Sequence, residues 1–103
     1  MNKMAPPSPL ETRVDLLWHI GEQIERRGSY TLNISLELPD AARYHAFEYL
    51  KKKELISTME ERSRFTDQLI AECRLTGRGR MVYQQIEQGY RTLISSLVSE
   101  LSE

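Results

Sequence analysis

One stretch of the chain, residues 38–56, constrains the fold most because it carries a complete set of helix signals. Asp40 follows a proline and can accept hydrogen bonds from the free N–H groups of a first helical turn. The three lysines at positions 51–53 suit the negative end of a helix. Apolar residues recur at helical spacing, and this pattern predicts a buried stripe of Ala42, Ala46, Tyr49 and Leu50. Four residues near the start fall partly outside this stripe, namely Arg43, Tyr44, His45 and Phe47.

Composition and length place the chain among ordinary globular domains. It has 103 residues, of which 40% are hydrophobic and 28% charged, so we expect one domain with a modest core. No apolar run approaches the roughly 20 residues that span a bilayer, and the N-terminus lacks the apolar core of a signal peptide. We therefore expect a cytoplasmic protein with no membrane partner. The single cysteine, Cys73, agrees with a reducing compartment.

Charge is distributed unevenly along the chain. The net charge is -1, which gives no overall basic signature of nucleic-acid binding. Residues 41–80 nevertheless contain nine Lys and Arg against six Asp and Glu, while the segments on both sides carry a negative excess. The positive excess therefore falls on the helix of residues 38–56 and on the segment that follows it.

The N-terminal part of the chain predicts a tail and then an amphipathic helix. Residues 1–8 contain prolines and small residues without an apolar pattern, so we expect a flexible tail. Ser8, Pro9 and Glu11 form a capping box with proline at the first helical position. The predicted helix runs for about sixteen residues and ends at Gly28, where a left-handed conformation can close it.

The segment that follows, residues 30–38, allows two interpretations. Apolar and polar residues alternate strictly from Tyr30 to Leu38, which is the period of a half-buried strand. A helix-turn-helix, in contrast, needs a short helix here, packed before the helix of residues 38–56. A short helix would favour contacts with DNA, and a strand would favour contacts with a protein partner.

A β-hairpin and a long helix complete the predicted order of elements. Residues 55–60 form the first predicted strand, and the return strand runs from about Phe65 to Thr76 with Cys73 in its apolar register as a small buried side chain. The break at residues 76–80 leads into a final helix. Its apolar stripe consists of Tyr83, Ile86, Tyr90, Leu93 and Leu97. We expect this stripe to form a homodimer interface or to fold back on the first helix, and the two arrangements are compatible.

This order of elements resembles the winged helix-turn-helix superfamily, in particular PadR-like and MarR-like transcriptional regulators. The resemblance rests on residues 49–56, Tyr-Leu-Lys-Lys-Lys-Glu-Leu-Ile, and on residues 73–80, Cys-Arg-Leu-Thr-Gly-Arg-Gly-Arg. The family's usual glycine before Leu-Ile is Glu54 here, and the interval from Tyr30 to Leu55 is a few residues shorter. The implied fold class is α+β: a winged-helix-like domain over residues 9–80 (helix, strand or short helix, helix, hairpin wing) followed by a long dimerisation helix over residues 81–103.

The resemblance implies a homodimer that binds double-stranded DNA through one helix and one wing per subunit. Arg43, Tyr44 and His45 would approach base edges, and Arg43 is the best single candidate because a guanidinium can bond guanine through two donors. The implied phosphate contacts are Lys51, Lys52, Arg62 and Arg64, and Arg78 would either bind phosphate or only solvate the loop before the last helix. Without a separate activation or ligand domain in these residues, we expect a repressor.

No catalytic constellation, metal-ligand spacing or cofactor motif is visible in the sequence. The two histidines, His19 and His45, and the single cysteine do not form a His-x-x-x-His or Cys-x-x-Cys pattern. Gly77 and Gly79 lack the third glycine of a dinucleotide-binding loop. We expect no enzyme. The alternative function is a protein-protein interaction module, such as an adaptor, an anti-regulator or a secretion chaperone on the same scaffold.

Overall fold

The computed structural model describes the backbone of residues 8–101 and the side chains of residues 8–93. This part of the chain contains four helices and a three-stranded antiparallel sheet, so the predicted α+β class is confirmed. The elements are α1 (Pro9–Arg27), β1 (Tyr30–Asn33), α2 (Ile34–Glu37), α3 (Ala41–Lys52), β2 (Ile56–Arg62), β3 (Leu69–Leu75) and α4 (Gly77–Leu101). The tail predicted for residues 1–8 lies outside the described residues except for Ser8.

The caps of α1 lie where the sequence predicts them. The Ser8 hydroxyl oxygen accepts a hydrogen bond from the Glu11 N–H at 3.2 Å, and Pro9 occupies the first turn. Gly28 closes the helix in the left-handed conformation, with a φ of 82°, and donates its N–H to the Ile24 carbonyl. The helix has 19 residues, a little longer than predicted.

The ambiguous segment after α1 contains both predicted structures in succession. The strand β1 ends at Asn33, and residues Ile34–Glu37 form the single helical turn α2. Asn33 causes the change, because its side-chain oxygen accepts the Leu36 N–H at 3.0 Å and caps the turn. The strict alternation of the sequence therefore describes only the first four residues of this segment.

The sheet has the strand order β1-β3-β2, so that β3 lies between the two strands that precede it in the chain. Ile56 is opposite Leu75 at one end of the β2–β3 hairpin, and Arg62 is opposite Leu69 at the other. The predicted return strand started too early, at Phe65. The Ser63 N–H donates to the Gln68 carbonyl at 2.8 Å, and this bond closes a turn before the extended backbone of β3 begins.

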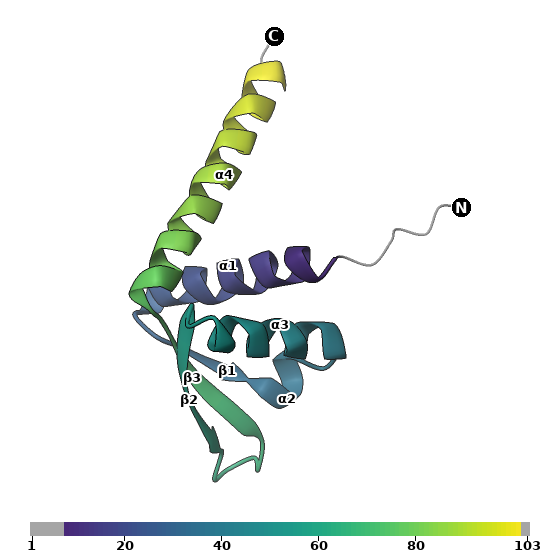
Figure 1. The fold of residues 1–103 in the computed structure, drawn as a ribbon, viewed down its shortest axis with the longest axis vertical. Coiled ribbons are helices and arrows are strands. Elements are labelled where there is room, and N and C mark those ends of the chain that lie inside the picture. Colours follow the sequence, from purple (N-terminus) through teal and green to yellow (C-terminus); the bar gives the residue numbers. More distant parts are fainter. Residues whose placement is uncertain (1–7, 102–103) are drawn as a thin grey trace, which may run out of the picture.

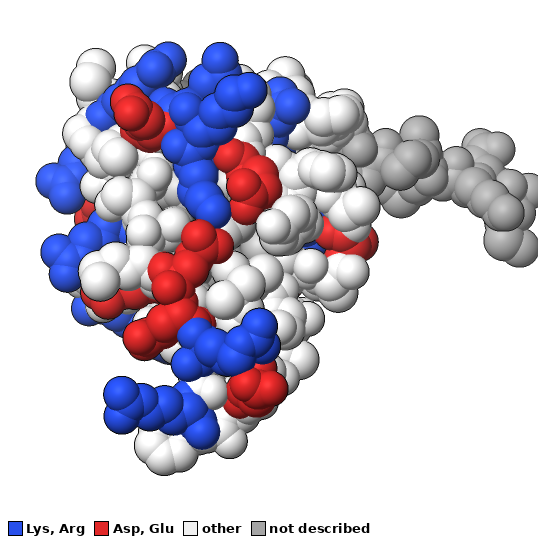
Figure 2. Space-filling model, turned by 60° about the horizontal axis from the view of Figure 1, so that its bottom comes forward, with Lys and Arg blue, Asp and Glu red and all other residues white. Residues whose placement is uncertain are grey.

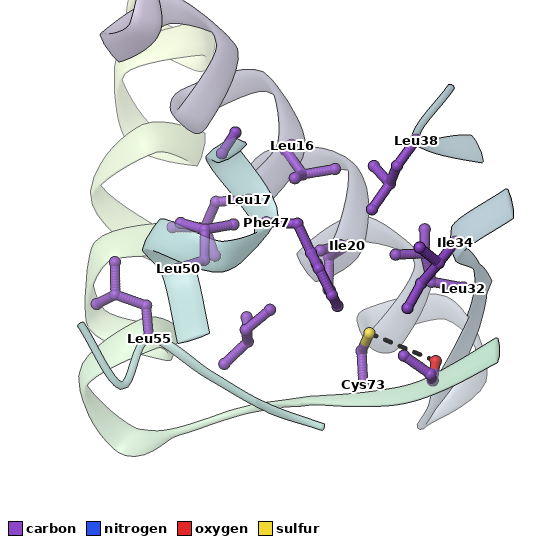
Figure 3. Close-up of a cluster of buried hydrophobic side chains, with 13 residues drawn as sticks. Leu16, Leu17, Ile20, Leu32, Ile34, Leu38, Phe47, Leu50, Leu55 and Cys73 are labelled. Carbon is purple, nitrogen blue, oxygen red and sulfur yellow. Dashed lines mark hydrogen bonds between the residues drawn. The ribbon is translucent and has the colours of Figure 1, made fainter. Parts of the chain in front are cut away.

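The core lies between α1, α3 and one face of the sheet, as Figure 3 shows. From α3 it contains Ala46, Phe47 and Leu50, and the Phe47 ring is 0% exposed. The predicted stripe was therefore wrong at two positions, because Ala42 is exposed and Phe47 is fully buried. The reason is that α3 is covered on two sides, by α1 and by the sheet. The other members of the core that are less than 2% exposed are Leu16, Leu17, Ile20, Leu32, Ala71 and Cys73.

A strained turn connects α3 to β2. Glu54 has a φ of 57° in the left-handed region, which costs a residue with a β-carbon roughly 1–2 kcal/mol. Glycine, which the resembling family usually has at this position, would take this conformation without that cost. The strained turn is held by the Leu55 N–H, which donates to the Leu50 carbonyl at 3.0 Å.

The helix α4 begins at Gly77, four residues before the predicted boundary, because Thr76 caps it. The Thr76 hydroxyl accepts the Gly79 N–H at 3.0 Å. Near its start α4 packs on α1, where the Trp18 ring stacks on Tyr83 with 5.3 Å between centroids and meets the edge of Tyr90 at 5.0 Å. Figure 1 shows that the rest of α4 rises away from the body of the domain, on the side opposite to the β2–β3 hairpin.

Two glycines of α4 give a paired test of this packing. A methyl group on Gly79 would overlap the Leu55 carbonyl oxygen, whereas a methyl group on Gly89 would meet no atom within 4 Å. We expect Gly79→Ala to lower the free energy of unfolding by about 2 kcal/mol or more. Gly89→Ala should raise it by up to about 1 kcal/mol, because alanine favours the helix. Urea unfolding at one fixed protein concentration measures both, and equal stability of the two variants would contradict the packing of α4 against Leu55.

Candidate nucleic-acid interface

The exposed side of α3 carries polar and charged side chains from its first turn to its last. Tyr44 and His45 are both exposed near the start, with their rings in edge contact at 6.3 Å between centroids. At 100° per residue, His45 and Lys52 lie opposite the buried Phe47. Glu48 shares this exposed side, so the surface of α3 is polar and mixed in charge rather than uniformly basic.

Arg43 lies on a different side of α3 from His45. It is one helical turn before Phe47 and therefore points toward the edge of the core, although its side chain is exposed. Its positive charge is close enough to Tyr30 to oppose the upward shift of that residue's pKa. Among the described residues, no carboxylate oxygen lies within 4.0 Å of the Arg43 guanidinium. The three predicted base-contacting residues are thus brought to one end of α3, but not to one face.

The predicted phosphate contacts at the end of α3 differ in their surroundings. The Lys51 ammonium bonds Glu48 at 3.2 Å and Glu60 on β2 at 3.0 Å. Burial lowers the pKa of Lys51, but the bonds and charges of these two carboxylates outweigh burial and raise it overall. Lys51 therefore joins α3 to β2, whereas Lys52 and Lys53 are exposed and have no carboxylate within 4.0 Å in the described structure. The predicted site omitted Lys53, although it belongs to the same lysine run.

A hydrogen-bond network fixes the position of α2 against α1 and β1. One oxygen of the Glu37 carboxylate accepts the Tyr30 hydroxyl proton, and the other accepts the Asn33 N–H at 2.6 Å. His19 on α1 completes the group, with its Nε2 3.1 Å from the Tyr30 hydroxyl oxygen. Burial and the bond to Glu37 raise the pKa of Tyr30, so the tyrosine stays protonated as a donor. The sequence offered no signal for this network beyond the residue types.

The β2–β3 hairpin ends in a turn that carries two of the predicted phosphate contacts. Arg62 donates to the Asp67 carbonyl at 2.9 Å, with its Nε 3.9 Å from the Asp67 carboxylate. Arg64 is exposed and has no carboxylate within 4.0 Å among the described side chains. The turn is tied to α2, because the Asn33 amide donates to the Gln68 side-chain oxygen at 2.7 Å. Arg62 therefore stabilises the turn through its contacts with Asp67, whereas Arg64 makes no such contact among the described side chains.

The last predicted contact, Arg78, lies on the first turn of α4 with Arg80 near it, and both are exposed. This turn adjoins the turn between α3 and β2, because the Thr76 N–H donates to the Leu55 carbonyl at 3.2 Å. Figure 2 shows Lys and Arg side chains in separate groups, with Asp and Glu side chains between them. On the face shown in Figure 2, the basic side chains of the described residues form several small patches that acidic side chains separate.

A hollow of about 370 Å³ lies on the outer face of the sheet over Ser57, Met59 and Arg74, within the roughly 300–1,000 Å³ of a usual ligand pocket. Two smaller hollows fall below that size. One, of about 160 Å³, lies between α1 and α3 beside Arg13 and His45. The other, of about 140 Å³, lies on the outer face of the sheet around Met59 and Glu61. Among the residues that the structure describes, no three His, Cys, Asp or Glu side chains gather into a group that could hold a metal ion.

Comparisons with known proteins provide no evidence for or against this interface. No family model matches the chain, and neither a curated protein nor a solved structure matches it. Within the described range, none of the helices combines the length and apolar character needed to cross a membrane.

Cys73 is the remaining residue with reactive chemistry, and its surroundings suppress that chemistry. Its side chain is 0% exposed, points into the core in Figure 3, and donates to the Ala71 carbonyl at 3.6 Å. Burial, followed by the charges of Glu37 and Glu60, raises the pKa of Cys73 to about 12. A thiol in this state is a small core side chain and not a nucleophile.

This environment predicts a pH dependence. Because the folded pKa lies above the ordinary thiol value, the native state keeps its proton where the unfolded chain loses it. The free energy of unfolding should therefore fall as the pH rises from about 9 toward 12, by at most about 1.4 kcal/mol per pH unit from this group. Thiol titration with a disulfide reagent should find Cys73 unreactive at pH 8 until urea unfolds the chain. Rapid labelling of the native protein would contradict its burial.

Proposed function

We propose that this protein is a dimeric DNA-binding transcriptional regulator with a winged-helix architecture. The order of elements supports the proposal: α1, β1, α2 and α3 are followed by the β2–β3 hairpin, and β3 lies in the centre of the sheet. In this reading α3 is the recognition helix and the hairpin is the wing. Repression, the mode of action expected from the sequence, stays a prediction.

The observation that carries the proposal is the single helical turn of α2 directly before an exposed α3. A helix-turn-helix needs a short helix at this place. Three hydrogen bonds of Asn33 and Glu37 hold this turn in place, although α2 has only four residues. It leaves one side of α3 open to a partner over the helix's whole length, which is the requirement for a helix that enters a major groove.

The proposed contacts divide by their surroundings. Tyr44 and His45 are exposed near the start of α3 and would meet base edges, and Arg43 would approach from the side of α3 that faces Tyr30. Lys52, Arg64 and Arg78 are exposed cations that would neutralise phosphates. Lys51 and Arg62 would support the site through their bonds to Glu60 and Asp67.

A homodimer through α4 is part of this proposal, and the burial along the predicted stripe supports it. Tyr83 is 4% exposed, Ile86 and Tyr90 are half-buried, and Leu93 is 57% exposed. The stripe loses its cover because α4 diverges from α1 (Figure 1). A second copy of α4 would cover the open part. The side chain of Leu97, the fifth residue predicted for this interface, lies outside the described side chains.

A second candidate function is a protein-protein interaction module on the same scaffold. Two observations favour it: the mixed charge of the surface in Figure 2, and Met59, which is 76% exposed on the outer face of the sheet. A partner protein would cover this apolar residue, whereas double-stranded DNA at α3 would leave it open.

DNA binding is tested with a mixed-sequence duplex at two salt concentrations. We expect binding at low salt that weakens as salt rises, because phosphate contacts release counterions. Lys52→Ala and Arg64→Ala should each weaken binding several-fold and make the logarithmic salt dependence shallower by roughly one. Arg26→Ala is the control, since Arg26 is an exposed cation on α1 that bonds Glu22. No binding of the unchanged protein at low salt would exclude the DNA proposal and leave the interaction module.

The dimer is tested by placing a charge on the open part of the stripe. Leu93→Glu should yield monomers in sedimentation velocity, because the partner helix would have to bury a carboxylate. Met81→Glu is the matched control: Met81 is 64% exposed on α4 but lies on the opposite side of the helix. A wild-type chain that sediments as a monomer at micromolar concentration would refute the interface.

A further inference from the structure

The tip of the β2–β3 hairpin carries the most exposed apolar side chain of the described residues. Phe65 is 98% exposed, so its ring makes essentially no contact with the rest of the domain. The sequence pattern placed this residue at the start of the return strand, in the register of its apolar side chains. Exposing a phenyl ring to water is unfavourable, and the fold gains nothing from it. Its position therefore points to a role outside the core.

The turn that presents Phe65 is held by its own hydrogen bonds. The Asp67 N–H donates to the Ser63 carbonyl at 3.0 Å, and the Phe65 N–H donates to the Ser63 hydroxyl oxygen at 3.3 Å. Asp67 takes a left-handed φ of 55°, and Arg62 holds its carbonyl. Through Gln68 the base of the turn is bonded to Asn33, the last residue of β1. The ring is thus displayed on a preorganised support that keeps it away from the sheet.

The shape and position of the tip limit what can cover the ring. Figure 1 shows the hairpin on the side of the domain opposite to the rising end of α4, so a dimer formed through α4 leaves both tips open. A stable protein interface buries about 800 Å² on each partner, more than a narrow turn provides. A single exposed apolar ring at the end of a hairpin matches the wedges that minor-groove proteins insert between base steps.

The charges at the tip favour a polyanion. The Arg62 guanidinium lies beside the Asp67 carboxylate and balances its charge. Arg64 adds a positive charge directly before Phe65, without a carboxylate within 4.0 Å among the described residues. Glu61, the nearest further carboxylate in sequence, faces the hollow on the outer side of the sheet.

We propose that Phe65 is an apolar wedge that enters the minor groove beside the helix-binding site and partly unstacks one base step, with Arg64 on a neighbouring phosphate. Proteins that kink DNA insert apolar side chains in this way, and the unstacking cost is offset by the extra contacts of the bent duplex. This inference rests on the proposed DNA binding, and it adds a distortion of the duplex that phosphate contacts alone do not produce.

The test compares two mixed-sequence duplexes of about 30 base pairs at low salt, one fully paired and one with a central T·T mismatch beside a 2-aminopurine. A mismatch lowers the unstacking cost, so we expect wild-type protein to bind this duplex at least about fivefold more tightly and to raise the 2-aminopurine fluorescence. Phe65→Ala should lose both the preference and the fluorescence change. Phe65→Leu should retain part of each, because it stays apolar.

The controls separate the wedge from the proposed function. Met59→Ala removes another exposed apolar side chain of the same hairpin and should behave as wild type. Phe65→Ala should keep the wild-type melting temperature, since the ring has no contacts to lose.

Wild-type binding to neither duplex would overturn DNA binding and the wedge together. Binding to both duplexes that Phe65→Ala leaves unchanged would overturn the wedge alone. Loss of binding to phosphatidylcholine–phosphatidylglycerol vesicles in Phe65→Ala, with DNA binding unaltered, would assign the ring to a lipid surface instead.

Discussion

The burial of Phe47 is the constraint on which the arrangement of the candidate interface depends. Its ring lies fully inside the core between α1 and the sheet, and it fixes the rotation of α3 about its own axis. Once this rotation is set, His45 and Lys52 must face outward, and Arg43 must lie on the same side of α3 as Phe47. The surface that a partner would meet is therefore decided by one buried side chain rather than by the exposed residues themselves.

Local capping signals correctly predicted both ends of α1 and the start of α3, but not the start of α4. Ser8, Gly28 and Asp40 act through backbone groups within a few residues of themselves, so their effect does not depend on the rest of the fold. The same holds for Asn33, although the alternating pattern around it concealed its capping role. The element order and the α+β class followed from signals of this kind.

Burial and bonding partners were harder to predict, because they depend on distant elements. The apolar stripe of α3 was assigned with Ala42 inside and Phe47 at its edge, since a single helix does not reveal that it is covered on two sides. The sequence alone could not distinguish Lys51 from Lys52, because the bond from Lys51 to Glu60 exists only once β2 lies beside α3. Glu54 has a left-handed backbone conformation, which its residue type does not predict. These features belong to the tertiary structure, and so does the exposure of Phe65.

Asn33 also links parts of the molecule that the chain keeps apart. Its backbone ends β1 and donates to Glu37, its side-chain oxygen caps α2, and its amide holds Gln68 at the base of the hairpin turn. The helical turn before α3 and the tip of the hairpin therefore share one side chain as a common support. Substitutions at the two places would not act independently, so the affinity of a variant in one could not be added to that of a variant in the other. Selection on this protein would have to change the two contact regions together.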